Sequence, residues 1–340
     1  MHAPDLTRSS ASPRYAAVEL GSDSFRLHVA RVEDGELRLE ASLAEPVRLA
    51  ASFDGDGSLC EAAMRRALAC LRAFADTLAL WRPQAVRVVA TSALRMARNA
   101  PVFLQAAEGV LRRPVEPLAA DEAGRLVYLG VASTLPPGDE ARLVLDIGGA
   151  STELVRGRGD RVDGVESIPV GAVRQSLSFF ADGVLDAAAF DAAVRSGRSR
   201  FAETALAGRP PSGCAVYGAC GTVRALAEIA RDDGLGDGRL DRACLLELRR
   251  RFLQAGHVAR IRLAWPAAAR APHLAGGLAL LLALIEEGGI ERVVPVQAGL
   301  RVGALWELHS RGAGYRPFAG WALPAHASGA RTHRSDASVG

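Results

Sequence analysis

One apolar stretch that breaks at an acid and two glycines constrains this chain more than any other feature. Residues Leu143 to Leu154 read Leu-Val-Leu-Asp-Ile-Gly-Gly-Ala-Ser-Thr-Glu-Leu. The apolar residues predict a short buried strand, and the glycines predict a tight turn after it. Glycine lets backbone N–H groups approach an anion, and the serine and threonine add hydroxyl donors. A β-hairpin whose Gly-Gly pair only makes the turn explains the same residues, so one copy leaves both interpretations open.

A second copy of the pattern near the N-terminus favours the anion-binding interpretation. Tyr15–Leu20 is an apolar strand that contains Glu19 near its end, Gly21-Ser22-Asp23-Ser24 follows, and Phe25–Val32 is a further apolar strand. Two such units in one chain predict two similar halves that face each other across a cleft. Each half would contribute one phosphate-holding loop.

Composition and charge exclude several classes of function. All of the basic residues apart from histidine are arginine, which excludes a Walker A lysine, a Schiff-base lysine and the strand lysine of protein kinases. A net charge of +3 gives no strong field for general nucleic-acid binding. Five cysteines without zinc-type spacing indicate reduced thiols in a cytoplasmic protein. The longest apolar run, Leu278–Ile285, is too short to span a membrane.

Strands followed by helices occur in two successive sets, and this order predicts an α/β architecture with two halves. We expect a disordered leader over 1–13, an N-terminal domain over 14–135, a C-terminal domain over 136–314 and a disordered tail over 315–340. A last helix at about 299–311 is expected to pack back on the first domain.

Two further loops have the composition of phosphate sites. Ala219-Cys220-Gly221-Thr222 connects a strand to a helix whose N-terminal amides would face an anion, and Thr91–Arg95 offers an arginine. A surface ion pair explains Arg95 equally well. Because no Cys or His constellation stands out, the residues favour metal-assisted attack by water on a phosphoryl group over nucleophilic catalysis.

These motifs together resemble the exopolyphosphatase and guanosine-pentaphosphate phosphohydrolase family. The resemblance runs from about Tyr15 to about Gly314. Its carriers are Val18–Leu27, Ala90–Arg95 with Asn99, Asp146–Leu154, Pro169–Arg174, Gly218–Arg224 and Gly299–Gly303. It implies a two-domain actin-like ATPase (ribonuclease H-like) fold with an interdomain cleft, in the short form without helical C-terminal domains.

The resemblance also implies roles for individual residues. Polyphosphate would lie in the cleft with Mg²⁺, and water would attack its terminal phosphoryl group. Asp146 and Glu19 would be metal ligands, and Glu153 would act on water. The implied phosphate-binding residues are Ser22, Asp23, Ser24, Arg95, Gly148, Gly149, Ser151, Thr152, Gly221 and Thr222.

Several positions depart from the family pattern. Glu19 stands where the family usually has Asp, Asp23 where it has Asn, and Ala150 where it has a third glycine. The longer Glu19 side chain moves a carboxylate outward, and Asp23 places a negative charge beside a phosphate site. Ala150 restricts the freedom of the second loop.

The general base is the most serious departure. The family base is the second Glu of a Glu-Glu-Ala segment that opens a helix, and here the segment reads Asp121-Glu122-Ala123-Gly124-Arg125. Counting without a gap puts Ala123 at the base position, whereas a shift of one residue puts Glu122 there. On a helix this shift is a rotation of about 100°, so it decides which side chain faces the cleft.

The leading hypothesis is therefore an exopolyphosphatase that releases orthophosphate from inorganic polyphosphate, with Glu122 as base, Mg²⁺ as cofactor and pppGpp as a second substrate. The alternative is a catalytically weak regulator that binds polyphosphate or a guanosine nucleotide. An ATP-using sugar kinase or chaperone of the same fold ranks lower, because no second substrate domain is recognisable. Homodimerisation is an expectation from the resemblance alone, and neither nucleic-acid nor membrane partners are expected.

Overall fold

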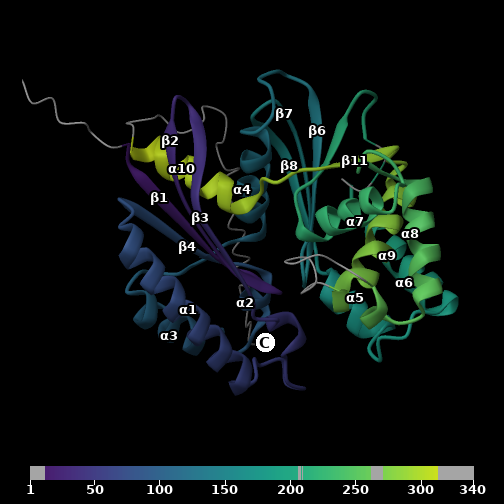
Figure 1. Ribbon diagram of the computed structural model, residues 1–340, viewed down its shortest axis with the longest axis horizontal. Helices are drawn as coiled ribbons and strands as arrows, with labels where there is room; N and C mark the ends of the chain where they lie inside the picture. Colours follow the sequence, from purple (N-terminus) through teal and green to yellow (C-terminus); the bar gives the residue numbers. More distant parts are fainter. Residues whose placement is uncertain (1–11, 206–207, 209, 262–270, 313–340) are drawn as a thin grey trace, which may run out of the picture.

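The protein is built around two mixed β-sheets (Figure 1). Five strands of the second sheet follow the same order as the five strands of the first, and β10 is added at one edge. The computed structural model describes residues 12–205, 208, 210–261 and 271–312. The first sheet has the order β3-β2-β1-β4-β5 and the second β10-β11-β9-β6-β7-β8. The strands of the first sheet are β1 (Arg14–Leu20), β2 (Ser24–Glu33), β3 (Glu36–Pro46), β4 (Ala85–Ala90) and β5 (Glu116–Pro117). Those of the second are β6 (Ala141–Ile147), β7 (Thr152–Arg158), β8 (Arg161–Ile168), β9 (Ala215–Gly218), β10 (Leu240–Asp241) and β11 (Arg292–Pro295).

The strands β1 and β6 occupy equivalent places in their sheets. Each pairs antiparallel with the strand that follows it and parallel with β4 or β9 on its other side. Both show the same burial along their length, with four consecutive buried residues before the acid. A strand covered on both faces needs a continuous apolar run, which both copies of the sequence motif supply. The two sequence motifs thus lie at equivalent ends of two similar sheets.

Helices cover the outer side of each sheet and fill the space between the sheets. In the first half, α1 (Glu61–Trp81) and α3 (Ala100–Leu111) pack on the sheet, and α2 (Ser92–Met96) and the 3₁₀ turn η1 (Leu49–Ala51) lie near the cavity described below. The helices of the second half are α5 (Ala172–Phe179), α6 (Ala187–Ala202), α7 (Gly221–Asp232), α8 (Arg242–Ala255) and α9 (Ala271–Gly288), with the 3₁₀ turn η2 (Val258–Arg260). Between the sheets lies α4 (Ala120–Ala132), with a separate apolar cluster that includes Val89, Val144 and Val155.

Two helices of the second half have clear end signals. The helix α8 ends at Ala255, because Gly256 adopts a left-handed φ of 67° that stops it. The helix α6 begins after Asp186, whose side chain accepts from the Ala189 N–H, and ends at Ala202. The expected tail and the first eleven residues of the expected leader lie outside the described residues. All five cysteines are free thiols. Among the described helices, none has the length and hydropathy that crossing a membrane requires.

The last helix, α10 (Leu300–Gly312), lies across α4 and β1 rather than on the second sheet (Figure 1). Glycines permit this crossing. A Cβ at Gly303 would lie 2.0 Å from the carbonyl oxygen of Leu126, and one at Gly130 would lie 2.1 Å from that of Gly299. Because backbone atoms block both positions, neither helix can accept a side chain there without moving apart.

Gly303→Ala is therefore expected to lower the free energy of unfolding by at least about 1–3 kcal/mol, the range typical of overpacking. Gly109→Ala is the matched control, because Gly109 lies in α3 with open space around its Cβ position. That substitution is expected to stabilise by about 0.5–1 kcal/mol through helix propensity. Urea unfolding of both variants measures the difference, and a Gly303→Ala protein as stable as wild type would contradict the packing.

Candidate active site

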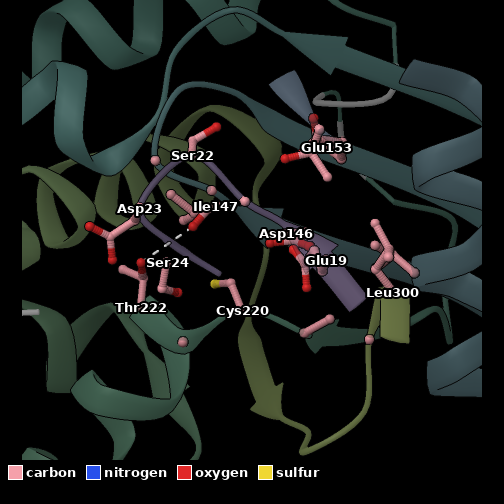
Figure 2. A pocket seen from close by; sticks show the side chains of 18 of the residues that line it. Glu19, Ser22, Asp23, Ser24, Asp146, Ile147, Glu153, Cys220, Thr222 and Leu300 are labelled. Atoms are coloured by element: carbon pink, nitrogen blue, oxygen red, sulfur yellow. Dashed lines mark hydrogen bonds between the residues drawn. The ribbon is translucent and has the colours of Figure 1, made fainter. Parts of the chain in front are cut away.

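A cavity of about 130 Å³ lies where the carboxyl ends of β1 and β6 meet (Figure 2). Its walls come from both halves of the protein and include the four loops singled out by the sequence. The predicted site residues that line it are Glu19, Ser22, Asp23, Ser24, Arg95, Asp146, Gly148, Gly149, Ser151, Glu153, Gly221 and Thr222. Glu122 and Thr152 do not line it.

The first loop, Gly21–Ser24, is tied to the start of α2 by Ser22. The Ser22 hydroxyl accepts from the Ala93 N–H at 3.0 Å and shares a 3.0 Å hydrogen bond with the Ser92 hydroxyl. Gly21 permits a tight turn, since a Cβ there would lie 2.6 Å from the Ser24 carbonyl oxygen. The loop is therefore held in one shape by the segment that carries Arg95.

The second loop touches the first. The Gly148 N–H donates to the Ser151 carbonyl at 2.9 Å, and the N–H groups of Val173 and Arg174 donate to the Gly149 carbonyl. A Cβ built on Gly149 would be 3.2 Å from the Ser22 Cβ, so the two loops approach within van der Waals contact. Glycine at this position is needed for that approach. The pair of loops thus forms one continuous wall of backbone amides and hydroxyls.

Thr152, expected in the phosphate-binding set, faces away from this wall. Its side chain is fully buried, and its hydroxyl donates to the Val170 carbonyl at 2.7 Å. The reason is the alternation along β7, which places Glu153 on the cavity side and its neighbour Thr152 on the other. The Thr152 hydroxyl therefore binds within the protein, and the side chain does not reach the cavity, where a phosphate contact was expected.

The third loop begins α7, and the fourth supplies a cation. Cys220 caps α7 by accepting from the Val223 N–H at 3.3 Å, and Thr222 donates to the Ile147 carbonyl at 3.3 Å (dashed in Figure 2). Arg95 donates to the Leu118 carbonyl at 2.8 Å, which fixes its side chain at the cavity wall. Both loops therefore present polar groups to the same space as the two glycine loops.

Three carboxylates meet in the cavity, as Figure 2 shows for Glu19, Asp146 and Glu153. Asp146 and Glu153 are directly opposite in the β6–β7 ladder, so both side chains lie on one face. Burial, and then the charges of Glu153 and Glu19, raises the pKa of Asp146 to about 7. Burial also raises the pKa of Glu153, against hydrogen bonds from Ser151 and Ser167 that favour the charged form. This cluster concentrates negative charge that a cation would neutralise.

The carboxylates fit a magnesium ion only in combination with a substrate. In the described part of the chain, no group of three or more His, Cys, Asp or Glu residues has the geometry to hold a metal by itself. Mg²⁺ commonly uses one or two carboxylates and completes its shell with phosphate oxygens and water. Glu19 is already ion-paired with Arg301, so Asp146 is the first candidate for this role.

The structure distinguishes between Glu122 and Ala123, the two residues that the sequence left open for the position facing the cleft. Ala123 lines the cavity and is 5% exposed, whereas Glu122 points out of it. This arrangement agrees with the count made without a gap. The Glu122 carboxylate accepts from Arg125 at 2.7 and 2.8 Å and from Arg87 at 3.2 Å. The structure therefore corrects the expectation that Glu122 faces the cleft.

Glu122 belongs to an ion-pair network at the crossing of α4 and α10. Arg87 also binds Glu116 and Glu307, and Arg125 binds Glu307 at 2.7 Å. Burial acts to raise the pKa of Glu122, but the hydrogen bonds and charges of Arg125 and Arg87 outweigh it and hold the pKa below its ordinary value. The network stabilises the ionised glutamate.

Glu122→Gln is expected to remove a pH-dependent part of the stability and to leave the cavity unchanged, because Glu122 does not line it. A depressed folded-state pKa contributes stability that is complete above the ordinary glutamate pKa of about 4.3 and disappears as the pH falls through the folded-state value. Thermal unfolding between pH 3 and 7 measures it. The wild type should lose more stability than the variant on acidification, and parallel curves would contradict the assignment.

Three arginines line the cavity that the sequence had not assigned to the site: Arg26, Arg224 and Arg301. Each of these arginines lies within one of the motifs on which the family resemblance rests, a few residues from an acid or a glycine turn. Their shared place in the motifs could have identified them as site residues. Arg301 is ion-paired with Glu19 and donates to His28 at 3.2 Å. Burial, and then Arg301 and Arg26, lowers the pKa of His28 to about 3, so this histidine is neutral and accepts.

Arg26 and Arg224 lack a carboxylate partner among the described residues. Arg26 donates to the Ser24 hydroxyl at 2.9 Å, and Arg224 donates to the Gln297 carbonyl at 3.4 Å. Burial, and then Arg26, lowers the pKa of Arg224 from its ordinary value. The charge of Asp146 acts on both guanidinium groups, but no carboxylate of the described residues contacts them directly, so both remain able to bind an anion in the cavity.

Comparison with solved structures gives the same fold. An exopolyphosphatase-like protein is 25% identical, with a TM-score of 0.77 and coverage of 89% of this chain and 99% of that one. An exopolyphosphatase from Cytophaga hutchinsonii is 20% identical, with a TM-score of 0.77 and the same coverage. A Ppx/GppA family member from Aquifex aeolicus is 24% identical, with a TM-score of 0.70 and coverage of 89% and 99%.

The two similar sheets, with a cavity between them that is lined by amides, hydroxyls and arginines, define an α/β protein with the fold of these solved structures. The model of the Ppx/GppA phosphatase family matches residues 28–311. The chain belongs to this family, whose members are exopolyphosphatase-like phosphatases.

Proposed function

We propose that this protein removes terminal orthophosphate from inorganic polyphosphate in the cavity between β1 and β6. The observation that carries the proposal is the contact of two glycine loops beside buried carboxylates and arginines. Amides and hydroxyls of the loops would hold the terminal phosphoryl group, and Arg95 would neutralise part of its charge.

The shape beyond the cavity supports a chain-like anion as substrate. A second cavity of about 490 Å³ adjoins the first and shares Asp23, Ser24, Arg26, Gly221, Arg224, Gln297 and Arg301 with it. The residues that line only the second cavity include one arginine, Arg231, and one carboxylate, Glu228. The others, including the neutral His28, carry no charge. The phosphates that follow the terminal one would lie along Arg26, Arg224 and Arg231. We propose pppGpp as a second substrate.

In this proposal Asp146 would hold Mg²⁺ with phosphate oxygens and water. When bound, the ion would supply charge neutralisation at the phosphoryl oxygens. Glu153 would take the proton from the attacking water, because it is the one left of the group Glu19, Asp146 and Glu153 once Glu19 is paired with Arg301 and Asp146 holds the ion. A carboxylate with a raised pKa is a better proton acceptor near neutral pH than an ordinary one.

Ala123 favours a second candidate function, a polyphosphate-binding regulator with little turnover. If the resemblance is counted without a gap, the base position falls on Ala123, which presents only a methyl group to the cavity. Such a protein would bind the same substrate and report its abundance without consuming it.

Paired binding and phosphate-release assays on long polyphosphate, pppGpp and ATP distinguish the two candidates. The proposed hydrolase binds polyphosphate and releases orthophosphate from it faster than from pppGpp, and it leaves ATP intact. Binding of polyphosphate without release above the buffer blank would select the regulator, whereas failure to bind polyphosphate would reject both.

A further inference from the structure

Glu153 receives two hydrogen bonds on the same oxygen. Ser151 donates to Glu153 Oε1 at 2.6 Å and Ser167 donates to Oε1 at 3.0 Å. Within the described residues, no hydrogen bond reaches Oε2 of this side chain. The two serines therefore fix the carboxylate through one oxygen and leave the other for a ligand or a water molecule.

The two serines occupy different positions relative to the cavity. Ser151 lines it as part of the second glycine loop, whereas Ser167 does not line it. Ser167 stands near the end of β8, directly opposite Glu153 in the β7–β8 ladder, so its side chain lies on the same face as Glu153. Ser167 touches the carboxylate without reaching the place of a substrate.

This difference has a consequence when phosphate binds. A serine hydroxyl has one proton to donate, and the Ser151 hydroxyl lies in the loop that would hold the phosphoryl group. A bound phosphate competes with Glu153 for that proton. The Ser167 hydroxyl has no such competitor, because its one hydrogen-bond partner among the described residues is Glu153.

We propose that Ser167 is a positioning residue that keeps Glu153 oriented toward the attacking water when Ser151 turns to the substrate phosphate. The inference rests on the proposed hydrolysis and on Glu153 as its proton acceptor. Small errors in the placement of a reacting group reduce rates by factors of about 10². The loss of Ser167 should therefore appear in kcat and leave substrate binding intact.

Ser167→Ala is expected to lower kcat for phosphate release by at least about tenfold, with KM and the polyphosphate Kd within about twofold of wild type. Ser167→Thr, which keeps the hydroxyl on a residue suited to a strand, should recover most of the loss. In a Glu153→Gln background, Ser167→Ala should cause no further decrease. A fall in Tm with unchanged kcat, or an equal loss in the Glu153→Gln background, would overturn the proposal.

A crystal structure of each protein with orthophosphate bound tests the inference independently of turnover. The Glu153 side chain should keep one orientation in wild type and Ser167→Thr and leave it in Ser167→Ala. An unmoved Glu153 in phosphate-bound Ser167→Ala would reject the positioning role. Absence of phosphate release from wild type would instead reject the proposed function, so the two failures are distinguishable.

Discussion

Replacing Glu153 with glutamine is expected to reduce kcat for phosphate release by at least about 100-fold, while the Kd for polyphosphate changes less than about threefold. Glutamine has nearly the same shape and accepts the hydrogen bonds of Ser151 and Ser167, but it cannot take a proton from water. General base catalysis contributes about 10²–10⁴-fold to a rate. The expected loss is therefore in the chemical step and not in binding.

Steady-state phosphate release and equilibrium binding of polyphosphate measure the two quantities separately. Glu36→Gln is the matched control, since Glu36 is exposed at the start of β3, and it should behave as wild type. Turnover by Glu153→Gln at a rate close to that of wild type would show that Glu153 is not the proton acceptor.

Introducing the missing carboxylate is expected to have the opposite effect. Ala123→Glu should raise the rate of phosphate release by at least about tenfold, at the low end of general base contributions. Ala123 lies in the first turns of α4 and lines the cavity, so a longer side chain there extends into the space of the substrate. Val155, two residues after Glu153 on β7, and its ladder partner Val165 pack next to the adjoining Gly124 position, so α4 lies against the strand that carries Glu153.

Ala123→Gln separates the chemical effect from the change in volume. Glutamine fills the same space without a basic oxygen, so the account predicts no gain for it. An equal change in rate for the glutamate and glutamine variants would mean that Ala123 influences the shape of the cavity alone. Both variants should keep the fold, because the side chain has a cavity to enter.

The sequence predicted the two sheets and the four loops because the determinants are local. An apolar run that ends in an acid and glycine specifies a strand and a turn whichever residues lie elsewhere. The repetition of that motif predicted that the two loops face each other across a cleft, and the structure adds that Gly149 lies against Ser22. The side chain of Thr152 was expected in the phosphate-binding set. Strand alternation alone places it on the opposite face of β7 from Glu153, so the sequence contained the information against that assignment.

The orientation of α4 was beyond the sequence for a different reason. Glu122 and Ala123 are consecutive residues in the first turn of α4, so their side chains point about 100° apart. The apolar pattern of the helix does not decide which of the two faces the cavity. The rotation is set by Gly124, where a Cβ would lie 2.4 Å from Val165, and by Arg87 and Arg125, which hold Glu122 outside the cavity. The contacts of Gly124 with Val165 and of Glu122 with Arg87 join segments that are distant in the sequence.

The partner of Glu19 was also beyond prediction from the sequence, because it comes from a distant segment. Its carboxylate was expected to be a metal ligand, and the expectation stays a prediction. The structure shows that Glu19 binds Arg301 from the helix α10, whose place across β1 follows from the glycine contacts with α4. A longer acid at this position reaches an arginine that comes from the far end of the chain.

Single-turnover phosphate release tests the central claim most directly. Wild-type protein in excess over a short polyphosphate, with Mg²⁺ and then with a chelator, shows whether the protein hydrolyses the polyphosphate that it is proposed to bind. The account predicts release of terminal orthophosphate with Mg²⁺ and a loss of release with the chelator. Polyphosphate that stays bound and intact in the presence of Mg²⁺ would contradict it.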